Sequence, residues 1–126
     1  MSQSVYEAQS FCKEAISNGK VWGIKDATGI PVPEGDGGIK TMPFWSSEAN
    51  AQAFVSQAKN YVGFEIFEVA LTIFVDKWLT GLATDEVLVG LNWSGEHALG
   101  ADIEPENLKE AIEYQQSEEN SLEDDV

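Results

Sequence analysis

The chain has 126 residues, of which 43% are hydrophobic and 10% aromatic, and its formal net charge at pH 7 is −15. A chain of this length and hydrophobicity is expected to fold as one domain that buries about two-thirds of its unfolded surface. All seven basic residues are lysines. A strong negative charge without arginine argues against direct binding to nucleic acid or to an anionic membrane.

The negative charge is concentrated late in the chain. Thirteen of the twenty-two acidic residues lie from residue 85 onward, where Lys109 is the only cation. The longest mostly apolar stretch, residues 62–75, contains Glu65 and Glu68 and is shorter than the roughly 20 residues of a membrane-spanning helix. The N-terminal residues lack the basic region and following apolar run that are typical of a secretory signal. We therefore expect a cytoplasmic protein that does not associate with membranes.

Capping signals, turns and apolar periodicity define the expected elements of the first half of the chain. They are a helix over 4–18, a strand over 21–24, a turn at 26–29, a hairpin partner strand over 30–32, a flexible loop over 34–38, a strand over 39–45 and a helix from Ser46 or Ser47 to Lys59. On the second helix, Ala49, Ala53 and Phe54 are expected to face the core, and Ala58 is a further candidate.

The second half is expected to add a strand over 64–71, a helix over 72–80 and a buried central strand over 87–93. A last helix begins at Pro105, with Leu108, Ala111 and Ile112 facing the core. These elements predict a single α+β domain over residues 1–114, with about four helices packed on a mixed or antiparallel sheet of about five strands. Residues 115–126 are predicted to be an acidic, mobile tail.

Four segments, taken in order, resemble a family of small bacterial proteins known as domain of unknown function 2750. They are residues 21–26, 42–49, 77–82 and 89–95, and they include a Phe-Trp-Ser-Ser and an Asn-Trp-Ser-Gly signature. The resemblance spans roughly residues 8–113 and implies a single cytosolic domain with no established activity, cofactor or catalytic residue. A weaker likeness, to the N-terminal domain of the secretion-enhancer SseB family, implies an interaction module.

Four tryptophans are a large number for a chain of this size. Trp78 lies on a helical apolar stripe and is expected in the core, whereas Trp45 and Trp93 end strands beside hydroxyls and glycine, where exposure is more common. Packing in the core is the simplest interpretation of all four. The alternative is an aromatic cleft between the Trp45 and Trp93 turns, with Ser47, Asn92 or His97 as polar contacts.

No catalytic or metal-binding pattern is present. Ser46, Ser47 and Ser94 have no suitably placed base, because the one histidine, His97, is only three residues from Ser94. One histidine and one cysteine, Cys12, cannot form a zinc site, and the calcium-loop spacing is absent. We therefore expect no cofactor, no metal and no enzymatic activity.

The acidic final third has a simple interpretation, which is solubility, and a more specific one, which is binding to a basic protein. The residues assigned to such a binding surface are Glu96, Asp102, Glu104, Glu106, Glu110 and Glu113. The leading hypothesis is a non-catalytic protein that engages a basic partner and thereby inhibits or neutralises it. The alternatives are an enzyme or small-ligand-binding domain that uses the Trp45 and Trp93 turns, and a structural subunit of a homo-oligomer.

Overall fold

The computed structural model describes residues 3–124. Its helical segments are α1 (Gln3–Asn18), a 3-10 turn η1 (Asp36–Gly38), α2 (Glu48–Gln57), a continuous run of α3 (Leu71–Ile73), the π-helical turn η2 (Phe74–Trp78) and α4 (Leu79–Thr84), and finally α5 (Pro105–Asp124). The strands are β1 (Lys20–Lys25), β2 (Thr41–Phe44), β3 (Glu65–Ala70), β4 (Leu88–Ser94) and β5 (Leu99–Ile103). The predicted α+β class with about four helices and five strands is confirmed.

The strands form two sheets that meet at a pair of tryptophans. β1 pairs antiparallel with β3, while β2 pairs parallel with β4 and β4 pairs antiparallel with β5. Trp22 and Trp45 exchange two backbone hydrogen bonds of 2.8 Å each and so join β1 to the end of β2. The strands thus pair in both directions, which agrees with the mixed sheet that was one of the two predicted forms, the other being antiparallel.

The predicted hairpin between residues 21–24 and 30–32 is wrong. The turn itself forms, since Asp26 and Gly29 exchange two backbone hydrogen bonds of 3.0 Å. The chain after the turn carries Pro31 and Pro33, which have no backbone N–H to donate to a ladder, and residues 30–32 form no strand. The partner of β1 is instead β3, which comes some forty residues later.

The buried side of α2 also differs from the prediction. Ser47 is the N-cap, with its hydroxyl oxygen accepting from the backbone N–H of Asn50 at 3.1 Å. Phe54 and Ala58 are buried as expected, but Ala49 and Ala53 are exposed. The helix begins at Glu48, and its buried side carries Ala51, Phe54 and Val55. Alanine is common on both sides of a helix, so Ala49 and Ala53 did not identify the buried side correctly.

Two further elements extend beyond the predictions. The third helical run continues to Thr84, with the π-helical turn absorbing the change in register around Trp78. Residues 99–103, which were assigned to no element, form β5 as the antiparallel partner of β4. Their sequence, with a glycine and two exposed positions at its start, has little β character, so the pairing with β4 determines the strand.

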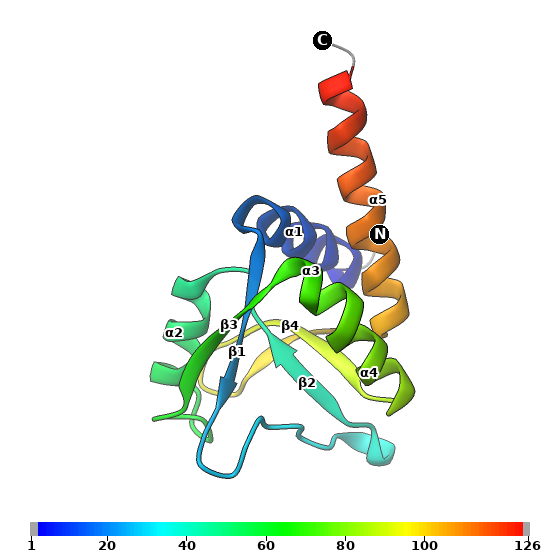
Figure 1. The fold of residues 1–126 in the computed structure, drawn as a ribbon. Helices are drawn as coiled ribbons and strands as arrows, with labels where there is room; N and C mark the ends of the chain where they lie inside the picture. Colours follow the sequence, from blue (N-terminus) through cyan, green and yellow to red (C-terminus); the bar gives the residue numbers. More distant parts are fainter. Residues whose placement is uncertain (1–2, 125–126) are drawn as a thin grey trace.

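The last helix begins at Pro105 as predicted but does not end near Tyr114. α5 continues to Asp124, and its second half extends away from the body of the domain (Figure 1). The sequence between Gln115 and Asp124 has no glycine or proline and is rich in glutamate and glutamine, which favour a helix even where no apolar stripe continues. Residues 125–126 of the predicted tail lie outside the described residues.

The core has two parts, on either side of the joined sheets. The larger part packs α1, α4 and the first half of α5 against β4, and includes Phe11, Phe44, Phe74, Leu91, Leu108 and Ile112, all 1% exposed or less. The smaller part packs α2 against Trp22, Ile24, Trp45 and Trp93. Figure 1 shows α1 and α5 side by side on one side of the sheet and α2 at the opposite end of the domain.

Candidate functional site

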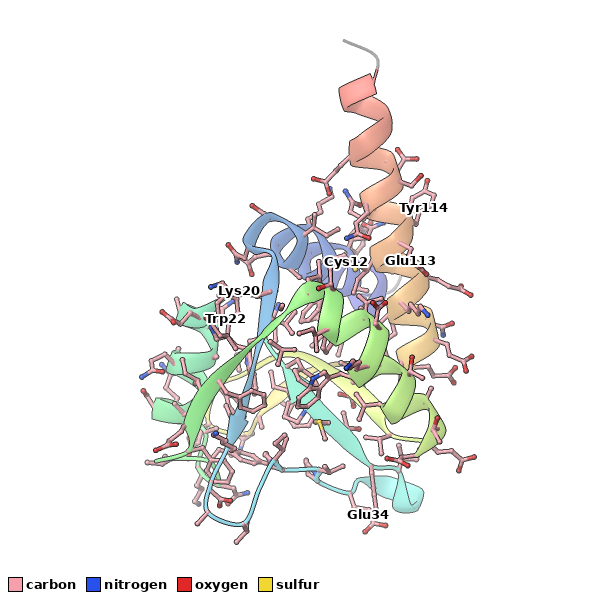
Figure 2. All side chains as sticks on the ribbon, in the orientation of Figure 1. Cys12, Lys20, Trp22, Glu34, Glu113 and Tyr114 are labelled. Carbon is pink, nitrogen blue, oxygen red and sulfur yellow. The ribbon has the colours of Figure 1, made fainter. Side chains whose placement is uncertain are left out.

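Four of the six acidic residues assigned to a binding surface lie just before α5 and along its first half. We call them the acidic surface: Glu104, Glu106, Glu110 and Glu113. All four side chains are exposed. Glu106, Glu110 and Glu113 are spaced i, i+4 and i+7 on the side of α5 opposite Leu108 and Ile112, which are both fully buried. Figure 2 shows Tyr114, the neighbour of Glu113, pointing outward from the helix.

Glu96 is not part of this surface. It lies in the turn between β4 and β5, where its backbone carbonyl accepts a hydrogen bond of 3.1 Å from the N–H of Lys59, two residues after the end of α2. The length of β5, about 17 Å for five residues, separates this turn from Glu104. Asp102 also lies apart, because its Oδ1 accepts from the Trp93 indole on the face of β5 opposite Ile103. The predicted six-residue surface therefore reduces to four residues around α5.

The acidic surface is not neutralised within the described part of the chain. An ion pair elsewhere in the described residues joins Lys20 and Glu68, with 3.1 Å between Nζ and Oε2, and it lies on β1 and β3. On α5, Lys109 is the single cation among nearby carboxylates. Like charges at i, i+4 on a helix cost a few tenths of a kcal/mol per pair, so a cationic partner would relieve this repulsion.

The turns at Trp45 and Trp93 come together, but they do not form an exposed aromatic cleft. Trp45 is fully buried and Trp93 is 8% exposed, so the expectation that these two are the more exposed tryptophans is wrong. Trp78, expected to be the safest core residue, is only partly buried. The indole Nε1–H of Trp45 donates to the Trp93 carbonyl at 2.8 Å, and the Nε1–H of Trp93 donates to Asp102 Oδ1 at 3.0 Å.

Close packing against glycines explains the burial of Trp93. A methyl group at Gly90 or at Gly100 would lie 2.5 Å from an atom of the Trp93 ring system. The register between β4 and β5 shifts between Leu91 and Ser94, and Asn92 has a φ of 52° at this irregularity. The bulge turns the Trp93 side chain onto the two glycines, so this aromatic group belongs to the core.

Ser46 is the centre of a hydrogen-bond network that the sequence did not reveal. Its side chain is fully buried, its hydroxyl donates to Glu14 Oε1 at 2.6 Å, and the same oxygen accepts from Asn92 Nδ2 at 2.9 Å. Its backbone N–H donates to Asn92 Oδ1 at 3.0 Å, and its carbonyl accepts from Asn18 Nδ2 at 2.8 Å. The network fastens α1 to the sheet, and its fully buried hydroxyl leaves no path for a substrate.

The other residues proposed as polar contacts of a cleft have separate positions. Ser47 caps α2, while His97 is exposed in the turn after β4. Asn92 lines a hollow together with Tyr6, Glu7, Ser10 and Leu91, and neither tryptophan contributes to it. Trp45 and Trp93 are therefore in contact, but the hollow that Asn92 lines contains neither of them, nor Ser47 or His97.

The ionisation state of Cys12 also argues for a packing role. The thiol is 1% exposed, and burial raises its pKa from 9.0 to about 11. The neutral thiol is a poor nucleophile and a poor metal ligand near neutral pH. No group of three or more histidine, cysteine, aspartate or glutamate side chains within residues 3–124 is placed to hold a metal ion.

The acidic surface borders a groove whose other residues were not singled out in the sequence. Glu104, Pro105 and Glu106 face it from the start of α5, together with Glu86 and the apolar residues Ile39, Val87 and Leu88. The three contributing segments are far apart in the chain, so only the folded structure brings them together. The one local signal was the exposed pair of acids at residues 85 and 86, directly before an apolar strand.

The fold and the site thus define a small α+β domain with an exposed acidic helix. Residues 8–112 match the model of the family described as "Protein of unknown function (DUF2750)", so the chain belongs to this family. A search of curated proteins found no significant match. The family match agrees with the resemblance in the sequence signatures, and it leaves the likeness to the SseB N-terminal domain a prediction. None of the helices within residues 3–124 is both long and apolar enough to cross a membrane.

Proposed function

We propose that this chain is a non-catalytic cytoplasmic binding protein that uses the acidic surface around α5 to engage a basic protein. A partner with a cationic functional surface, such as a nuclease toxin or another nucleic-acid-binding protein, would be inhibited or neutralised by this contact. The proposal includes no direct binding to nucleic acid or membrane, in keeping with the net charge of −15.

The observation that carries the proposal is the arrangement of Glu106, Glu110 and Glu113. Their side chains are exposed along the outer side of a helix whose inner side is fixed in the core by Leu108 and Ile112. A rigid row of unneutralised carboxylates attracts a cationic surface over a distance of about one Debye length, near 8 Å at physiological salt. Such a row favours fast association with a basic partner.

The burial of Trp45, Trp93 and Ser46 gives the enzyme or small-ligand hypothesis no comparable support. The structural-subunit hypothesis would need a large apolar surface, whereas the outer side of α5 is charged. Neither alternative has a specific observation in its favour.

A pair of charge-matched variants tests the proposal. The double variant E110K/E113K reverses two charges on the acidic surface, and E65K/D76K reverses two exposed charges on β3 and η2. Both variants change the net charge equally. We expect affinity capture from cell lysate with mass spectrometry to recover a basic protein with wild type and with E65K/D76K, but not with E110K/E113K. The proposal would be refuted if neither wild type nor E65K/D76K recovered a basic protein. It would also be refuted if wild type and both variants recovered the same amount.

A further inference from the structure

One groove beside the acidic surface combines an apolar floor with an acidic rim. It has a volume of about 510 Å³ and is formed by three segments: the end of η1 with Ile39, the turn between α4 and β4, and the start of α5. In Figure 1 these segments meet where η1, the end of α4 and the first turn of α5 approach one another, on the side of the domain away from α2. The rim carries Glu86, Glu104 and Glu106.

The floor of the groove is apolar and partly open to solvent. Ile39 is 53% exposed although it is a large aliphatic residue, and it lies beside Val87 and Leu88. Ala83 and Pro105 complete the apolar lining. An exposed aliphatic residue at the mouth of a groove gains free energy when a partner's aliphatic atoms cover it.

The rim of the groove is uniformly negative. The side chains of Glu86, Glu104 and Glu106 are all exposed, and no lysine lines the groove. The nearest cation on α5, Lys109, lines a separate hollow beside α4 together with Glu106. Lys40, which follows Ile39 in the chain, is exposed but does not line the groove. The rim therefore has three carboxylates and no cation among its lining residues, which suits a cationic group of a partner.

We propose that this groove receives an arginine side chain of the basic partner. The aliphatic stem of the arginine packs on Ile39, Val87 and Leu88, while its guanidinium group reaches the carboxylates of Glu86, Glu104 and Glu106. An arginine side chain has this shape and chemistry: an apolar stem of three methylenes that ends in a planar fork of five N–H donors. This inference rests on the proposed function and specifies the chemical group that the acidic surface recognises.

Glu86 lines this groove from a strained backbone position. Glu86 follows the end of α4 with a φ of 58°, in the left-handed region where glycine is usual at the end of a helix. Its N–H bonds to the Ala83 carbonyl at 3.2 Å, and the next N–H, that of Val87, bonds to the Leu82 carbonyl at 2.9 Å. A glutamate here costs stability that a glycine would not, and in the groove its carboxylate supplies one side of the cation site.

The test uses a defined probe, an acetylated tetra-arginine amide, titrated into the 15N-labelled full chain and followed by two-dimensional NMR. The comparison probe is the same peptide built from 2-amino-3-guanidinopropionic acid, which keeps the guanidinium groups and shortens each aliphatic stem. We expect the largest shift changes at the amides of residues 38, 39, 86–88, 104 and 106. We expect the short-stem peptide to bind at least about threefold more weakly, because it cannot cover the apolar floor.

Two pairs of variants separate the groove from general charge attraction. I39A and E86Q change groove residues, whereas I73A and E65Q change a similarly exposed isoleucine and a glutamate elsewhere. Each groove variant should weaken tetra-arginine binding at least about threefold, and each control less than about 1.5-fold. All four positions are exposed, so the variants should fold, and their NMR spectra will show it.

The outcomes distinguish this inference from the proposed function. Shift changes confined to the outer residues of α5, such as Glu110 and Glu113, would overturn the groove and leave the acidic surface as the binding site. Equal affinity for the two peptides, or equal effects of I39A and I73A, would also overturn it. The absence of any shift change at millimolar peptide would overturn the groove, and the capture experiment above would then decide the proposed function separately.

Discussion

The indole N–H of Trp45 donates a hydrogen bond of 2.8 Å to the backbone carbonyl of Trp93, and both side chains lie in the smaller part of the core. The bond links the end of β2 to β4 immediately beyond their parallel pairing. Trp93 in turn donates to Asp102 on β5, so one chain of indole donors crosses three strands. Tryptophans that could have formed a binding cleft instead connect the strands of the sheet.

Replacement of Trp45 by phenylalanine should therefore be costly. W45F removes the Nε1 donor, leaves the Trp93 carbonyl without this partner and opens a small cavity beside Phe54. We expect the free energy of unfolding to fall by about 2–3 kcal/mol. Urea denaturation followed by circular dichroism measures the change. W78F is the matched control, because Trp78 is only partly buried, and it should cost less than half as much.

The glycines beneath the Trp93 ring provide a second test. In G100A the new methyl group would lie 2.5 Å from Trp93 Cδ1 and 3.0 Å from the Leu91 carbonyl oxygen, so both backbone and side chain must move. Overpacking of this kind costs about 1–3 kcal/mol. G81A, on an open side of α4 with nothing within 4 Å of the new methyl, should instead raise stability by about 0.5–1 kcal/mol. Thermal unfolding that ranks G100A above G81A would contradict this packing.

The buried thiol predicts a stability change at high pH. The folded pKa of Cys12 is raised from 9.0 to about 11, so the unfolded state loses its proton first. The stability that this group contributes is complete below about pH 9 and is lost as the pH rises toward 11, by up to about 2 kcal/mol. Burial also raises the pKa of Tyr61, which adds a loss of the same sign. The difference between wild type and C12A isolates the thiol: from pH 8 to 11, the free energy of unfolding should decline less in C12A.

The strained position of Glu86 predicts that one variant gains stability while it loses binding. E86G places glycine at a φ of 58° and should raise the free energy of unfolding by about 0.5–1 kcal/mol. E86A keeps a Cβ atom at the same φ and should give no such gain. Both variants should weaken binding of the tetra-arginine peptide. A stabilised E86G with unchanged peptide affinity would leave the backbone argument intact and contradict the role of the Glu86 carboxylate.

Local signals in the sequence were sufficient for most of the helices and for the fold class. Pro105 with flanking acids fixed the start of α5, and the Ser47 cap fixed the start of α2, because these signals act within one turn. These local signals failed where residues far apart in the chain determine which strands pair. β1 takes β3 as its partner rather than the nearby residues 30–32, and β5 depends on β4 for its conformation.

The candidate site shows the same limit. The acids of α5 could be placed on one outer stripe from their spacing alone, since helical periodicity determines which side chains share a face. Strand pairing decides the rest of the site. It separates Glu96 from this stripe, and it packs Trp93 against Gly90 and Gly100. It also brings Ile39 close to Glu86. No local pattern encodes these contacts.

Titration calorimetry of the captured basic partner at several salt concentrations gives the sharpest test of binding through α5. We expect the dissociation constant of wild type to rise steeply with salt. We expect E110K/E113K to weaken binding by about tenfold or more at physiological salt, and E65K/D76K to change it by less than about twofold. Equal weakening by the two variants, or an affinity that does not respond to salt, would contradict the claim that the acidic surface around α5 is the binding site.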